Sequence, residues 1–146
     1  MHTNGAYFDH LYIPAGGSAQ PASEETVRSR QHYIKMRGNE LFKVAVRSMA
    51  DVASRVLAQA GVKAQDLDLL IPHQANQRIT DAVAQRLEVG SDKVYSNISR
   101  IGNTSSASIP ICLDECVQSG RLKKGHLVLM VSFGAGVTFG AVLIRW

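Results

Sequence analysis

Apolar residues recur at helical spacing through one long segment of the chain, residues 40–60. Their positions follow the i, i+3, i+4 pattern that lines one face of an α-helix. Charged side chains repeat at i, i+4 on the opposite face, and Gly61 follows the last apolar position, as is common at a helix C-terminus. The pattern predicts an amphipathic helix over residues 40–60.

Shorter apolar runs alternate with helical patterns in the remaining C-terminal part of the chain. The expected strands are residues 67–71, 93–98, 126–133 and 137–145, and the expected helices are residues 76–87 and 105–119. Such alternation predicts an α/β layered fold. The last two strands flank Gly134-Ala135-Gly136, which indicates a tight reversal and therefore a mixed sheet rather than a purely parallel one.

The segment before the long helix has a different character. Residues 6–13 are rich in β-favouring side chains and stop at Pro14, which predicts a strand. Residues 14–26 are rich in Pro, Gly, Ala and Ser and predict a loop. There is no internal repeat or low-complexity tract, so we expect one domain.

Composition narrows the class of protein. With 146 residues, 45% of them hydrophobic and 19% charged, the chain is long enough to bury a core of its own. No apolar run approaches the roughly 18 residues that cross a bilayer, and the N-terminus lacks the pattern of a signal peptide. We therefore expect a soluble cytoplasmic protein, with Cys112 and Cys116 as reduced thiols in the core.

Charge is mild overall, at +4, but it is uneven along the chain. Residues 27–47 contain six basic side chains and one acidic one. A cationic face attracts nucleic acid, a phosphorylated cofactor or an acidic protein, although it can also be an ordinary solvated helix face. Nucleic acid is not expected, because the aromatic residues are few and do not alternate with the basic ones.

Two polar side chains follow predicted strands, where reactive groups of α/β sheets gather. His73 follows Pro72 and offers an imidazole that can donate or accept a proton, and Asn103 follows Gly102 and offers an amide donor. If both face one cavity, they form an oxyanion hole for a thioester oxygen about 3 Å from each donor. His73 would then be neutral, with its second ring nitrogen held by a backbone group. The alternative is a core histidine and an asparagine that only caps the next helix.

Three motifs carry a resemblance to a known family. They are Pro72-His73-Gln74-Ala75-Asn76, Gly102-Asn103-Thr104-Ser105 and Ser132-Phe133-Gly134-Ala135-Gly136. In this order and spacing, together with residues 36–43, they resemble the C-terminal half of β-ketoacyl-acyl-carrier-protein synthase III, a condensing enzyme with the thiolase fold. The resemblance implies a three-layer, thiolase-like half-domain over residues 1–146, with a mixed sheet, helices packed on it and the N-terminal nucleophile half absent. It places residues 1–4 inside the first strand of this half.

The resemblance also implies an acyltransferase of fatty acid synthesis, which condenses an acyl-CoA with malonyl-acyl-carrier-protein and releases CO₂. By position, His73 and Asn103 match the pair that stabilises the enolate, and Phe133 matches a phenylalanine near the nucleophile. The wall of the pantetheine channel matches Gly38, Phe42, Ala75, Asn76 and Ile79. The basic patch that docks the acidic carrier protein matches Lys43, Arg78 and Arg86. No cofactor, metal, nucleic acid or membrane is implied.

The nucleophilic cysteine of the family lies in the N-terminal half, which this chain lacks. Cys112 and Cys116 do not replace it, because they lie four residues apart inside a predicted helix. The chain alone is therefore expected to be inactive in condensation and to need the missing half or another copy as partner. Two alternatives are a non-catalytic module that binds carrier protein or packs on a synthase, and a residual malonyl-thioester decarboxylase.

Overall fold

A four-stranded mixed sheet forms the centre of the computed structural model, which describes all residues from 1 to 146. Its strand order is β1-β6-β5-β4. The strands are β1 (His2–Thr3), β4 (Leu69–Pro72), β5 (Leu127–Gly134) and β6 (Thr138–Arg145). β4 runs parallel to β5, whereas β6 pairs antiparallel with both β5 and β1. The prediction of a mixed sheet is confirmed, and so is the strand expected within residues 1–4.

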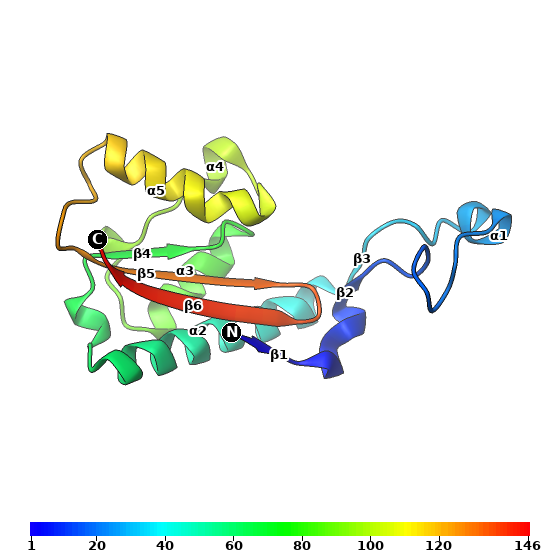
Figure 1. The fold of residues 1–146 in the computed structure, drawn as a ribbon, viewed down its shortest axis with the longest axis horizontal. Coiled ribbons are helices and arrows are strands. Elements are labelled where there is room, and N and C mark those ends of the chain that lie inside the picture. The colour runs from blue at the N-terminus through cyan, green and yellow to red at the C-terminus, as the bar shows by residue number, and fades with distance from the viewer.

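Helices cover both faces of this sheet and complete the three layers (Figure 1). α2 (Gly38–Ala60) and α3 (Gln77–Arg86) lie on one face. α5 (Ser108–Gln118) lies on the other face, with the short α4 (Ile98–Ile101) beside it. No helix in the structure combines the length and the apolar character that crossing a membrane requires.

The larger of two apolar clusters joins α2 to the sheet. The helix begins two residues earlier than predicted and ends where predicted, at Ala60. Gly61 follows it with a φ of 65°, the left-handed conformation that glycine adopts without strain. Met49, at the centre of the helix, is fully buried. Opposite the helix, the sheet contributes Leu70, Leu129 and Val131. Burial of this apolar stripe, rather than helix propensity alone, holds α2 in place.

The smaller apolar cluster joins α5 to the opposite face of the same strands. Cys112 and Cys116 of α5 contact Leu69, Ile71 and Val128 of the sheet, and all five are buried. Because the two clusters take alternate residues of β4, that strand is buried along its whole length.

The strand predicted over residues 6–13 is wrong. Residues Gly5–His10 form a 3₁₀ helix, and only β2 (Leu11–Tyr12) is extended, pairing with β3 (Lys35–Met36). The Asn4 side chain accepts a hydrogen bond from the Ala6 backbone N–H and starts this helix. β-favouring residues do not make a strand without a neighbouring strand to pair with, and here only two residues have one.

The loop predicted over residues 14–26 is correct only in its first part. A short helix, α1 (Glu24–Arg28), begins after Ser23, whose hydroxyl accepts from the Thr26 N–H while the Thr26 hydroxyl accepts from the Ser23 N–H. This capping box stabilises the first turn. The segment from β2 through α1 to β3 forms an arm that projects from the body of the molecule (Figure 1).

The strand predicted over residues 93–98 is also wrong. Residues Ser91–Lys93 form a 3₁₀ turn, only Val94 makes a bridge to β4, and α4 begins at residue 98. The helix predicted from residue 105 begins at Ser108, after a 3₁₀ turn over Ser105–Ala107. The segments on either side of α4 are therefore shaped by turns and polar contacts, not by a sheet ladder.

β6 has a helix over one face only, the face that packs against α2. α5 covers β4 and β5, but on β6 Val142 is 54% exposed. The arm carries further exposed large apolar side chains, among them Val27, Tyr33, Ile34 and Met36. Large exposed apolar side chains at these two places favour an interface or aggregation.

We therefore predict that the isolated chain associates at tens of micromolar, and that Val142→Lys reduces the association because a charged side chain opposes burial of that face. Static light scattering gives the molar mass. Val117→Lys is the matched control, since Val117 is also exposed but lies on α5. A wild-type chain that stays a clean monomer would contradict the prediction.

Candidate functional site

His73 is held at the carboxyl end of β4 by both its backbone and its ring. Its N–H donates to the Val131 carbonyl at 2.8 Å, one step beyond the ladder of β4 and β5. The ring lies edge-on to the Phe133 ring at 6.1 Å between centroids, and Nδ1 is 2.6 Å from the Ser108 Oγ. The expectation that a backbone group holds the second ring nitrogen is therefore wrong, because a hydroxyl occupies that place.

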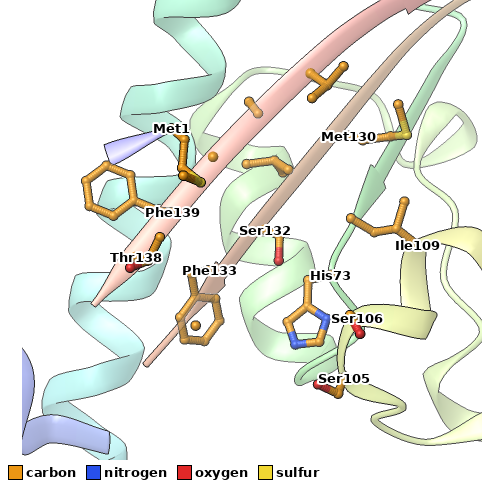
Figure 2. A pocket seen from close by; sticks show the side chains of 15 residues that line it. Met1, His73, Ser105, Ser106, Ile109, Met130, Ser132, Phe133, Thr138 and Phe139 are labelled. Atoms are coloured by element: carbon orange, nitrogen blue, oxygen red, sulfur yellow. The ribbon is translucent and has the colours of Figure 1, made fainter. Parts of the chain in front are cut away.

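His73 and Phe133 line a groove of about 650 Å³ on the face of the sheet that α5 only partly covers. Ser105, Ser106 and Ile109 form one side, and residues of β5 and β6 form its floor. Figure 2 shows the His73 ring between Phe133 and the two serines. The groove is mostly apolar, with a few polar groups at the His73 end, which is the usual character of a small-molecule site.

Burial lowers the pKa of His73 below its usual value, because desolvation disfavours the charged imidazolium. The ring is therefore neutral at pH 7 and presents one N–H and one bare nitrogen. A neutral imidazole donates one hydrogen bond through this N–H and can stabilise a developing negative charge.

Asn103 follows α4 in a turn that only glycine permits. Gly102 has φ 79° and ψ −168°, a region essentially closed to other residues. The Asn103 Oδ1 accepts from the Ser105 N–H at 2.9 Å, so its Nδ2 group remains available as a donor. This hydrogen bond also closes a local turn before the next helix, as expected if Asn103 only caps that helix.

His73 and Asn103 lie in two different loops, after β4 and after α4. Asn103 is exposed and does not itself line the groove, whereas Ser105 and Ser106, just after it, do. The convergence of His73 and Asn103 on one oxyanion therefore stays a prediction.

The side chain of Gln74 joins the His73 loop to the segment before α4. It is fully buried, and its Nε2 donates to the Pro72 carbonyl at 2.7 Å. Its Oε1 accepts from the Asn97 N–H at 3.0 Å and from the Ser96 hydroxyl at 2.9 Å. Sequence reasoning missed this role, although Gln74 lies beside His73 in the motif.

Glu115 of α5 anchors the segment that leads to Asn103. One carboxylate oxygen accepts from the Tyr95 hydroxyl at 2.8 Å, from the Asn97 Nδ2 at 2.9 Å and from the Arg100 guanidinium at 3.0 Å. These bonds, that from Asn97 foremost, lower the pKa of Glu115 below its usual value. No sequence pattern pointed to this residue, because its partners lie 15 to 20 positions away.

The residues assigned by resemblance to the pantetheine channel lie around the first turns of α2 and α3, outside the groove. Phe42 is half-buried, and the Arg78 guanidinium carbon lies 5.3 Å from its ring centroid. Asn76 caps α3 by accepting from the Arg78 N–H. Gly38 is exposed, Ala75 is half-buried and Ile79 lies in the core.

The residues assigned to carrier-protein docking, Lys43, Arg78 and Arg86, are all exposed and form no ion pair. In the basic stretch over residues 27–47, three of the six cations are neutralised within the molecule: Arg28 by Glu24, Arg37 by Asp9 and Arg47 by Asp51. The free positive charge is therefore smaller than the sequence count indicates.

The two cysteines are core residues, as predicted. Both side chains are fully buried, and burial is the main cause that raises the pKa of Cys112 to about 12 and that of Cys116 to about 11. Neither thiol carries appreciable thiolate at neutral pH, so neither is a nucleophile in this fold.

The three layers and the loops after β4 and α4 define the class of the protein by its fold, which is thiolase-like. Crystal structures of 3-oxoacyl-(acyl-carrier-protein) synthase III share the fold. That from Aquifex aeolicus is 45% identical with a TM-score of 0.85, and that from Pseudomonas aeruginosa is 40% identical with a TM-score of 0.87. Each match covers 99% of this chain and 42% or 43% of the other.

Sequence comparison gives the family. Residues 57–146 match the 3-oxoacyl-(acyl-carrier-protein) synthase III C-terminal family, and the chain belongs to it. Over all 146 residues it is 52% identical to the β-ketoacyl-(acyl-carrier-protein) synthase III of Symbiobacterium thermophilum and 48% identical to that of Syntrophomonas wolfei. The chain spans 44% of the length of each of these relatives. The resemblance drawn from the three motifs is confirmed.

We predict that Glu115→Ala loosens the segment from Asn97 to Gly102, because three donors lose their common acceptor. Amide hydrogen exchange should become several-fold faster at Arg100, Ile101 and Gly102, whose N–H groups close the α4 turn. Asp114→Ala is the matched control, since this neighbouring carboxylate makes no side-chain bond. Equal exchange in the two variants would refute the anchoring role.

Proposed function

We propose that this chain is the C-terminal catalytic half of a synthase that condenses an acyl-CoA with malonyl-acyl-carrier-protein at the start of fatty acid synthesis. The observation that carries the proposal is His73: a neutral imidazole, fixed at the end of β4, that faces an apolar groove beside Phe133. The family of the chain supports the same chemistry.

The proposed decarboxylation requires hydrogen-bond donors to the thioester oxygen, not groups that transfer a proton to it. When the bond between the malonyl α-carbon and its carboxylate breaks, CO₂ leaves and the electron pair passes to the thioester oxygen as an enolate. His73 and Asn103 donate to this oxygen and stabilise the charge that develops there. The enolate carbon then attacks the acyl thioester held on a cysteine, and that thiolate leaves.

The nucleophilic cysteine has to come from outside this chain, because Cys112 and Cys116 are buried and protonated. The uncovered face of β6, continuous with the groove, provides a surface on which a second half-domain can pack. The relatives are more than twice as long as this chain, which supports a second half-domain in the proposed synthase.

In this proposal the carrier protein docks on α2 and α3, which carry the three cations assigned to this role. Lys43, Arg78 and Arg86 are unpaired cations and suit an acidic carrier protein. The half-buried Phe42 and Ala75 offer apolar surface for the pantetheine arm, and Gly38, Asn76 and Ile79 are the other residues assigned to this wall.

A second candidate is malonyl-thioester decarboxylation without condensation. It is favoured by one observation: both proposed donors lie in this chain, while the nucleophile does not. The two candidate functions are distinguished by supplying the other half: the proposed synthase then condenses, whereas the residual decarboxylase does not.

To test the proposal, the chain is co-expressed with the N-terminal part of the Symbiobacterium thermophilum synthase, and CO₂ release and condensation are measured with malonyl-acyl-carrier-protein. We expect His73→Ala and Asn103→Ala each to lower the decarboxylation rate by about 10² to 10³, the effect of losing one oxyanion donor. Transfer of the primer to the cysteine should change less.

His126→Ala is the control, because His126 lies at the opposite end of β5 from Phe133. A hybrid in which His73→Ala decarboxylates as fast as the His126 control would refute the donor assignment. A hybrid that decarboxylates but never condenses would favour the second candidate.

We also predict that the chain alone takes no acyl group from acyl-CoA, because covalent catalysis needs an accessible thiolate. Intact-mass measurement after incubation with acetyl-CoA checks this, with the hybrid as positive control. A stoichiometric adduct on Cys112 or Cys116 would contradict the prediction.

A further inference from the structure

The hydroxyl of Ser108 is the only group that bonds the inner nitrogen of His73. Ser108 is the first residue of α5 and is buried, with 2% of its surface exposed. Its Oγ lies 2.6 Å from the His73 Nδ1 and accepts the Gln74 backbone N–H at 3.3 Å. One serine therefore contacts both the ring and the backbone of the loop after β4.

The direction of the bond follows from counting protons. A serine hydroxyl has one proton to donate and accepts through its lone pairs, one of which is taken by the Gln74 N–H. In the structure the Ser108 hydroxyl proton has no acceptor other than the His73 Nδ1. If Nδ1 carried the proton instead, this buried hydroxyl proton would be left without a partner, which is unfavourable.

We propose that Ser108 is a positioning residue that fixes His73 as the Nε2–H tautomer, so that the ring donates its single N–H into the groove. The inference rests on the proposed function for its catalytic meaning, because an enolate oxygen needs a donor at that position. The tautomer itself is a property of the chain alone.

The same contact disfavours the charged ring. An imidazolium would carry protons on both nitrogens, and its Nδ1–H would face the Ser108 hydroxyl, whose own proton would have to turn into the apolar interior. Ser108 thus acts in the same direction as burial, which already lowers the pKa of His73. Both effects keep His73 a neutral donor.

The test is nitrogen-15 NMR of the imidazole in the 146-residue chain at neutral pH, where the shifts of Nδ1 and Nε2 report which one carries the proton. We expect the wild-type ring to be the Nε2–H tautomer. Ser108→Ala removes the donor to Nδ1 and should shift the tautomer ratio toward Nδ1–H by about fivefold, the effect of one net hydrogen bond. Ser119→Ala, which removes a hydroxyl from the other end of α5, should leave the ratio unchanged.

Two results would overturn the proposal: a wild-type ring with its proton on Nδ1, or a Ser108→Ala ring with the wild-type ratio. If Ser108→Ala does not fold, Ser108→Cys keeps the side-chain shape and replaces the hydroxyl with a weak donor, and the same shift in smaller degree is expected. No substrate is present, so the outcome is independent of the decarboxylation test of the hybrid synthase.

Discussion

The buried carboxamide of Gln74 is the interaction on which the arrangement of the site depends. Its two ends bond the Pro72 carbonyl on one side and the Asn97 N–H on the other, so the loop after β4 and the segment before α4 share one set of hydrogen bonds. Shifting either loop would leave buried polar atoms unpaired, at a cost of about 1–3 kcal/mol for each. The position of His73, the preceding residue, follows from this constraint.

Helix α5 provides the second support, and it does so with residues that share one face. Ser108 and Glu115 are two turns apart, and Cys112 lies between them against the sheet. Ser108 bonds His73, Glu115 bonds Asn97 and Arg100, and burial of the thiol holds the helix in place. Apolar burial thus sets where the helix lies, while the directional polar bonds at its ends set the two loops.

The sequence predicts the elements whose pattern is local and periodic. The apolar stripe of residues 40–60 and the final pair of strands are confirmed within a few residues, because one buried face imposes its period on the chain. The strand predictions for residues 6–13 and 93–98 are wrong for the opposite reason. A strand needs a partner strand, and no local sequence pattern shows whether one is present. His73 was found from its place after a strand, whereas Ser108, Gln74 and Glu115 act across 15 to 35 positions.

The groove is suited to only one part of the proposed condensation. The loop that carries His73 is fixed by hydrogen bonds from its backbone and its ring, so this side chain is oriented before any substrate arrives. The floor of the groove on β6 is open to water, however, and hydrogen bonds to a developing charge are weaker in water than in a dry site. The thiols of this half are protected by the same core that supports His73, which removes them as nucleophiles. In the proposed synthase, closure of the groove by a second half-domain would supply both the nucleophilic thiolate and the exclusion of water.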